Sequence, residues 1–155
     1  MKNADFYGLV YMEYPDDYSE MSEEEISRYF RGNALRWGVR CPEKHIMLSL
    51  GKTGNSIFNV FYDAKGALNG AEKVLAKNLK DYKRRDEFDA VVLGNNAKGI
   101  HFEYTADDVD VRQFCELVVV KVKRCFYTVY CISRAKDAAT SAPLFEEFRG
   151  TLRLL

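Results

Sequence analysis

The pattern of hydrophobic residues is densest between Val111 and Ser133, where two apolar runs flank the basic residues Lys121, Lys123 and Arg124. Valine and aromatic residues occur at odd and even positions of both runs, so apolar side chains would fall on both faces of an extended chain. A strand with one face in water would alternate between apolar and polar residues instead. The pattern therefore predicts a central β-hairpin that is covered on both faces and has a basic turn in water.

Four further segments have the composition of strands: 6–14, 45–50, 88–93 and 98–105. The segment 98–105 alternates between apolar and polar positions, which indicates one buried face and one wetter face. The segment 57–62, with the sequence IFNVFY, is also interpreted as a short strand, although so short a run is compatible with a turn of buried helix.

Three segments show the spacing of apolar residues that is typical of helices. The segment 23–37 begins with an S-x-x-E capping box and places Trp37 on its buried stripe. The segment 69–84 ends in a cluster of lysine and arginine residues, which complements the dipole of a helix. A third helix is expected to begin at Ser141 and to end near Gly150.

These elements predict an α+β fold in which a central antiparallel sheet of about six strands is flanked by three helices. The chain has 155 residues and contains no internal repeat, low-complexity tract or linker. We therefore expect residues 1–155 to form a single α+β domain.

Charge and hydropathy exclude several classes of partner. Lysine and arginine together number 23, as do aspartate and glutamate, which argues against nucleic-acid binding through bulk charge. No apolar run approaches the roughly 20 residues that span a membrane, and residues 1–8 lack the apolar core of a signal peptide. We expect no nucleic-acid partner, no membrane insertion and, if Met1 is the natural start, a cytoplasmic protein. If a signal peptide has been trimmed from the chain, we expect an exported one.

The motifs that have the composition of a phosphate or metal site lack an essential residue. The segment 51–54, GKTG, is similar to the end of a phosphate-binding loop, but Ile46 stands where that loop needs glycine. The acidic segment 105–110 lacks the glycine and the closing glutamate of an EF-hand. The four cysteines contain no C-x-x-C pair and are predicted to be buried thiols. We expect neither a cofactor nor a metal ion.

An enzyme is an alternative that depends on His101 and Glu103. These two residues are expected to share one strand face, where they would act as a base and its orienting carboxylate, and Cys115 on a neighbouring strand would complete a hydrolase-type arrangement. However, a histidine and a glutamate two residues apart are also common on a wetter strand face, and no catalytic signature accompanies them. The expectation is therefore a protein that is not an enzyme.

The aromatic content favours a binding protein. Aromatic residues make up 14% of the chain, and tyrosine is enriched at protein interfaces. Tyr11, Tyr104 and Tyr127 are expected on strands whose outer faces are available to a ligand or a partner. Together with His101 and Glu103, they are the candidate binding residues.

The order of the elements resembles that of the PsbP-like fold superfamily. The resemblance depends on Tyr14-Pro15 at the end of the first strand, the segments 94–105 and 125–133, and Phe145 and Phe148 in the last helix. The superfamily includes an extrinsic subunit of photosystem II, a Ran-binding import factor and bacterial DcrB-like proteins. The resemblance implies a binding or assembly protein that acts through protein–protein contacts on a sheet face.

The DcrB-like members imply a second alternative. Some DcrB-like proteins are cytoplasmic chaperones that form homodimers and shelter an apolar helix of a secreted effector. The resemblance to them implies the same role for this chain. No residue of this chain identifies the protein partner or decides between a monomer and a homodimer. None of the contact residues of the family can be placed on this sequence.

Overall fold

The computed structural model describes residues 1–30, 32, 34–54 and 57–155, apart from the side chains of residues 57 and 58. The strands are β1 (Lys2–Phe6), β2 (Val10–Tyr14), β3 (Ser19–Glu20), β4 (Leu35–Cys41), β5 (Ile46–Lys52), β6 (Lys83–Val92), β7 (Asn95–Thr105), β8 (Arg112–Val122), β9 (Cys125–Arg134) and β10 (Arg153–Leu154). The helices are α1 (Glu23–Tyr29), α2 (Ala64–Asn78) and α3 (Ala138–Gly150), with the short 3-10 helices η1 (Pro42–Lys44), η2 (Ile57–Phe61) and η3 (Ala135–Asp137).

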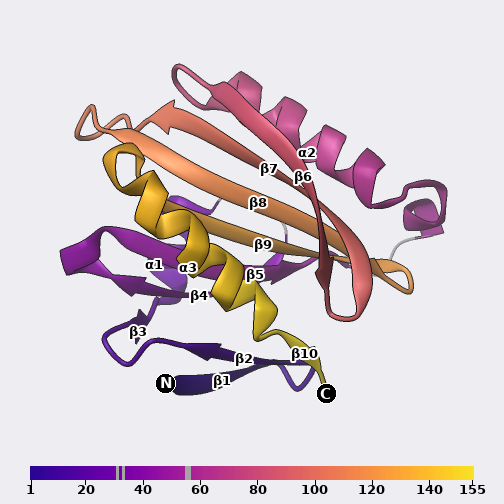
Figure 1. Ribbon diagram of the computed structural model, residues 1–155. Coiled ribbons are helices and arrows are strands. Elements are labelled where there is room, and N and C mark those ends of the chain that lie inside the picture. Colours follow the sequence, from indigo (N-terminus) through magenta and orange to yellow (C-terminus); the bar gives the residue numbers. More distant parts are fainter. Residues whose placement is uncertain (31, 33, 55–56) are drawn as a thin grey trace.

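The strands form two antiparallel sheets. The larger sheet has seven strands in the order β3-β4-β5-β9-β8-β7-β6, and the smaller has the order β1-β2-β10. Helices α2 and α3 lie on opposite sides of the larger sheet, and the smaller sheet lies on the same side as α3 (Figure 1). The α+β class, the three α-helices and the antiparallel sheet are confirmed, and the larger sheet has seven strands where about six were predicted.

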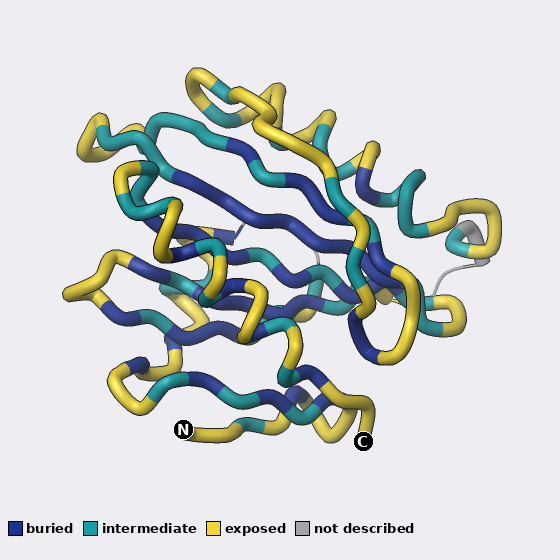
Figure 2. Tube along the Cα trace, viewed as in Figure 1, coloured by how far each residue is buried: buried dark blue, intermediate teal, exposed yellow. Residues whose placement is uncertain are grey.

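The central hairpin is covered on both faces, as its sequence predicts. Strand β8 directs Val118 and Val120 into a cluster with Phe145 of α3, and it directs Leu117 and Val119 into a second cluster beneath α2. We call these two sides of the larger sheet the α3 face and the α2 face. The middle strands are the most completely buried part of the chain (Figure 2).

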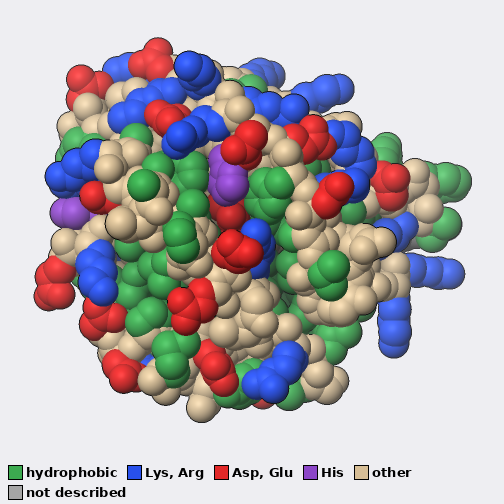
Figure 3. Space-filling view, in the orientation of Figure 1, with side chains coloured by type: hydrophobic (Ala, Val, Ile, Leu, Met, Phe, Trp, Pro, Cys, Tyr) green, Lys and Arg blue, Asp and Glu red, His purple; other side chains and the backbone are tan. Residues whose placement is uncertain are grey.

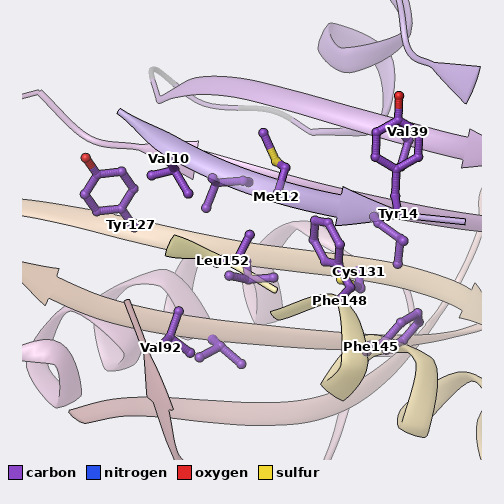
Figure 4. Close-up of a cluster of buried hydrophobic side chains, with 14 of the residues drawn as sticks. Val10, Met12, Tyr14, Val39, Val92, Tyr127, Cys131, Phe145, Phe148 and Leu152 are labelled. Carbon is purple, nitrogen blue, oxygen red and sulfur yellow. The ribbon is translucent and has the colours of Figure 1, made fainter. Parts of the chain in front are cut away.

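The α3 face is closed by the last part of the chain and by the smaller sheet. Phe145 and Phe148 point from α3 toward side chains of the larger sheet, while Val10 and Met12 of β2 enter the same cluster from the other side (Figure 4). Leu152, just beyond α3, lies among them. Strand β10 then pairs with β2, so the end of the chain ties the smaller sheet to the core.

The prediction of a helix over 23–37 is wrong beyond Tyr29. The chain forms β4 instead, and Trp37 packs against the ring of Tyr14 with a centroid separation of 5.6 Å. Apolar residues in this segment also recur at every second position, which is the spacing of a strand. Pairing with β5 favours this spacing over that of a helix. Gly38 does not end a helix. A Cβ atom there would lie 3.1 Å from the side chains of Ile26 and Met21, so the glycine lets α1 lie close to β4.

Other boundaries also differ from the predictions: the helix predicted over 69–84 ends at Asn78, and β6 begins at Lys83, before the predicted 88. The segment 57–62 is not a strand, because it forms η2 and leads into α2. Helix α2 begins after Asp63, whose carboxylate accepts a hydrogen bond from the Gly66 amide, earlier than the predicted 69. Helix α3 begins at Ala138, before Ser141, and contains Pro143.

The segment 6–14 forms parts of two strands, because the chain turns at Tyr7 and Gly8. Both residues have positive φ angles, 51° and 73°, and this backbone conformation matches a tight hairpin turn. Strand β1 pairs with β2 in antiparallel register, so the predicted first strand is a hairpin.

A substitution at Gly99 tests the packing between β6 and β7. Phe88 lies opposite Gly99, and a Cβ atom at Gly99 would come within 2.8 Å of three atoms of its ring. Gly99→Ala is expected to lower the free energy of unfolding by about 1–3 kcal/mol, because the ring must move. Gly70→Ala, in an open position of α2, should leave stability unchanged or raise it by about 0.5–1 kcal/mol. Urea denaturation measures both, and equal effects would contradict the close contact.

Candidate functional site

The structure places the five candidate residues in four separate environments. Tyr11 lies on the side of the smaller sheet that faces away from the core. Its hydroxyl donates a hydrogen bond of 2.7 Å to Glu13, and the guanidinium of Arg153 lies 4.7 Å above its ring. Tyr11 is therefore held in a surface cluster at one end of the molecule.

His101 is clamped between two carboxylates and two aromatic rings on the α3 face. Its Nδ1 lies 2.7 Å from a carboxylate oxygen of Asp86, and its Nε2 lies 2.9 Å from one of Glu116. The rings of Phe88 and Phe114 stack on its two sides, with centroids 4.7 and 5.2 Å away. Both nitrogens and both ring faces are occupied, so the imidazole has no free position for a substrate.

Glu116 is the buried member of this cluster. Its side chain is only 1% exposed, and its second carboxylate oxygen lies 3.9 Å from Nε of Arg149 on α3. Arg149 also lies over the ring of Phe88. Burial alone would lower the pKa of His101, but the hydrogen bonds to Glu116 and Asp86 outweigh it and raise that pKa above its ordinary value of 6.5. The cluster thus keeps a buried carboxylate between the imidazole of His101 and the guanidinium of Arg149.

Glu103 shares the strand face of His101 but does not orient it. A register shift between Arg84 and Asp86 brings Arg85 toward this face, where it lies 3.3 Å from one oxygen of Glu103. Arg112 lies 3.2 Å from the other oxygen. The carboxylate of Glu103 is therefore paired with two arginines, and the expected pairing of His101 with Glu103 is not formed.

Cys115 lies on the opposite face of the sheet from His101. It pairs with Phe102, whereas His101 pairs with Glu116, and residues that pair directly across an antiparallel sheet share one face. The thiol is fully buried beneath α2, and burial raises its pKa well above the ordinary value. The hydrolase-type arrangement of Cys115, His101 and Glu103 is therefore contradicted by the geometry.

Tyr104 also lies on the α2 face, where burial raises the pKa of its hydroxyl. It packs in the cluster that contains Phe102 and Tyr130. Tyr104 therefore lies on the covered α2 face of the sheet. It cannot form one site with the candidate residues on the α3 face.

Tyr127 lines an open groove at the end of the central hairpin. The groove has a volume of about 600 Å³ and runs between the β8–β9 turn and the last residues of the chain. Its apolar lining consists of Leu9, Val122, Cys125, Tyr127, Leu154 and Leu155. Tyr127 itself is 4% exposed, so its ring forms the floor.

The charged side chains that line the groove are all cations. They are Lys52, Lys123 and Arg124, and no aspartate or glutamate belongs to the lining. Within the described part of the chain, none of the three lies within ion-pair distance of a carboxylate. By contrast, a second hollow beside α3 mixes Glu43 and Asp137 with its cations. The groove is thus apolar at its floor and positive at its rim.

An aromatic projection lies on the other side of the same β8–β9 turn. Val60, Phe61 and Tyr62 are 53, 78 and 56% exposed. Hydrogen bonds hold this segment to the hairpin, from the Asn59 amide to the Arg124 carbonyl (2.7 Å) and from the Lys121 ammonium to the Tyr62 carbonyl (2.6 Å). Figure 3 shows hydrophobic side chains projecting at this edge, with Lys and Arg side chains nearby.

Sequence reasoning missed this projection because it interpreted 57–62 as a strand. The available signal was Asp63, which can cap a helix and thereby leaves the aromatic residues before it outside both the helix and the sheet. Tyr127 was among the candidate binding residues, but the cations around it were not singled out as part of a site.

Two features of the described residues bear on other classes of function. No group of three histidine, cysteine, aspartate or glutamate side chains there is arranged to hold a metal ion. None of the helices in that part of the chain is long and apolar enough to cross a membrane.

The His101 cluster predicts a pH dependence of stability. Because the folded state raises the pKa of His101, the stabilisation from its protonated form is complete below about pH 6.5 and is lost as the pH rises through the folded-state value. The difference in free energy of unfolding between the wild type and His101→Gln should therefore shrink as the pH is raised from about 5.5 to about 8.5. Urea denaturation at each pH measures it.

Asp86→Asn serves as the matched variant, because it removes one of the two carboxylates that raise the pKa of His101. It should weaken the pH dependence without abolishing it. A difference between the wild type and His101→Gln that stays constant or grows with pH would contradict this account of the cluster.

Comparisons with known proteins show similarity at the level of structure. No family model matches the chain, and no curated protein matches it. Cyanobacterial PsbP from Synechocystis is similar with a TM-score of 0.68 at 11% identity, covering 98% of this chain and 90% of that one. The Ran-binding protein Mog1p of Saccharomyces cerevisiae has a TM-score of 0.62 at 11% identity, covering 97% and 93%.

LpqN, which is involved in cell envelope biogenesis of Mycobacterium tuberculosis, has a TM-score of 0.61 at 16% identity, with coverage of 94% of this chain and 82% of that one. The similarity to all three extends over nearly the whole of this chain. At such low identity it concerns the arrangement of the elements and not the residues of any site. The chain therefore has the PsbP-like fold, as its sequence predicts.

Proposed function

We propose that this is a non-enzymatic binding protein that holds a segment of a partner protein in the groove beside the β8–β9 turn. The observation that carries the proposal is the lining of this groove, in which Lys52, Lys123 and Arg124 surround an apolar floor and no acidic residue is present. Surface cations without carboxylate partners attract opposite charge from a ligand.

The chemistry of the lining specifies the class of partner. The apolar floor, with Tyr127 at its base, suits an aliphatic or aromatic side chain, and the positive rim suits carboxylates next to it. The chain as a whole has a formal net charge of zero, so the excess of cations at the groove is local. We infer that the partner presents an acidic segment that also contains large apolar residues.

The aromatic projection enlarges the surface on which this partner would bind. Phe61 and Tyr62 are highly exposed, and their segment is hydrogen-bonded to Lys121 and Arg124 of the hairpin. Large aromatic side chains that are exposed beside a polar rim are typical of interface anchors. The groove would hold the acidic segment, and the projection would contact the body of the partner.

The fold is compatible with this role. A similar structure is that of a Ran-binding protein, so the same arrangement of strands and helices supports protein binding elsewhere. The identity of this partner does not transfer to the present chain, because the two share only 11% of their residues. The geometry around His101 also removes the specific arrangement on which the enzyme alternative depended.

Charge reversal at the turn tests the proposal. Peptides would be selected from a random phage-displayed library on the wild-type protein, and the affinity of a selected synthetic peptide would be measured by fluorescence anisotropy. The selected peptides should contain aspartate or glutamate beside apolar residues. Lys123→Glu combined with Arg124→Glu should weaken binding about tenfold or more, since two attractive charges become repulsive.

The matched control reverses two lysines on the exposed side of α2, Lys73→Glu with Lys77→Glu. It makes the same change in net charge and should leave the affinity within about twofold of the wild type. The proposal fails if the selected peptides lack acidic residues, or if both double variants weaken binding equally.

A further inference from the structure

The side chain of Arg36 lies flat across the α2 face of the larger sheet. Arg36 is on β4 and reaches over β5 to β9. Its Nη1 donates a hydrogen bond of 2.9 Å to the hydroxyl of Ser49, and its Nη2 donates one of 2.6 Å to the hydroxyl of Thr128. The guanidinium is thereby fixed in one position by side chains from two neighbouring strands.

A glycine provides the space for this guanidinium. Gly51 pairs with Arg36 across the two strands, and a Cβ atom at Gly51 would lie 2.5 Å from Nη2 and 2.7 Å from Cζ of Arg36. Any other residue there would therefore force the guanidinium out of this position. Phe30 lies on it from the side of α1, with the ring centroid 5.3 Å from Cζ. The arrangement is a shaped seat for a planar cation.

The positive charge in this seat has no counter-charge within the chain. No aspartate or glutamate of the described residues lies within ion-pair distance of Arg36, and every acidic residue of the chain is among those described. Arg40, on the same strand and the same face, is in contrast paired with Glu25. Both hydrogen-bond acceptors of Arg36 are neutral hydroxyls, and they engage two of its five N–H groups.

Such a site is unfavourable unless something completes it. Burial lowers the pKa of the Arg36 guanidinium to about 10, because the surroundings solvate a charge poorly. A largely buried cation without an anion costs the folded state free energy. The side chain nevertheless remains partly exposed to solvent, so an anion from outside can reach it.

We propose that Arg36 is the centre of an oxyanion-binding site that takes a carboxylate or a phosphate group of a ligand. Guanidinium groups bind both kinds of oxyanion through paired N–H donors. The hydroxyl of Thr128 lies next to the guanidinium, and the ring of Phe30 limits access of water on one side. This site is on the α2 face and is separate from the groove at Tyr127, so it does not depend on the binding function proposed above.

The test is a titration of the whole chain with sodium phosphate, with sodium acetate and, at equal ionic strength, with sodium chloride. The melting temperature should rise saturably by about 2–5 °C with at least one oxyanion and not with chloride. In parallel, nitrogen-edited NMR should show one arginine Nε–H signal shifting with the same saturation curve. A response to phosphate alone assigns the site to phosphorylated ligands, and a response to acetate assigns it to carboxylates.

Arg36→Gln should abolish both responses, whereas Arg28→Gln, which removes an exposed arginine of α1, should keep them. If Arg36→Gln does not fold, Arg36→Lys keeps the charge without the planar fork and should weaken the apparent affinity about tenfold. The proposal is overturned if neither oxyanion acts differently from chloride, or if the response persists without Arg36.

Discussion

Burial of the β8–β9 hairpin from both sides is the constraint on which the rest of this structure depends. A strand with apolar residues on both faces cannot be stable in a sheet that has one face in water. The chain meets this requirement with α2 on one face and with α3 and the smaller sheet on the other. The last residues matter to this arrangement, because β10 pairs with β2 and holds the smaller sheet over the core.

The elements that could be predicted from the sequence are those with a local signal. The apolar runs of β8 and β9 and the alternation in β7 each contain the information that defines them. Prediction failed around Trp37, where the apolar residues fit both the spacing of a helix and that of a strand. Pairing with β5 stabilises the strand. It also failed for the segment at the end of η2, where Phe61 and Tyr62 are exposed although aromatic residues are usually buried.

The chemistry of the candidate sites was less predictable than the fold. That His101 and Glu103 share a strand face follows from their spacing, but their partners come from β6 and β8. The isolation of Arg36 is also a property of the folded chain, because it depends on which cations receive the available carboxylates. Tyr127, one of the candidate binding residues, lies near the end of a central strand and forms the floor of a groove whose lining also includes residues from distant parts of the chain.

The edge strand β6 affects how another molecule can approach. Its first half, KRRDE, is exposed and rich in charges of both signs, and the register shift at Arg85 interrupts its regular pairing with β7. Charged side chains and bulges on an edge strand discourage the addition of a foreign strand and thereby limit aggregation. A partner would therefore meet side chains rather than free backbone groups along this edge, and recognition by shape and charge is favoured over extension of the sheet.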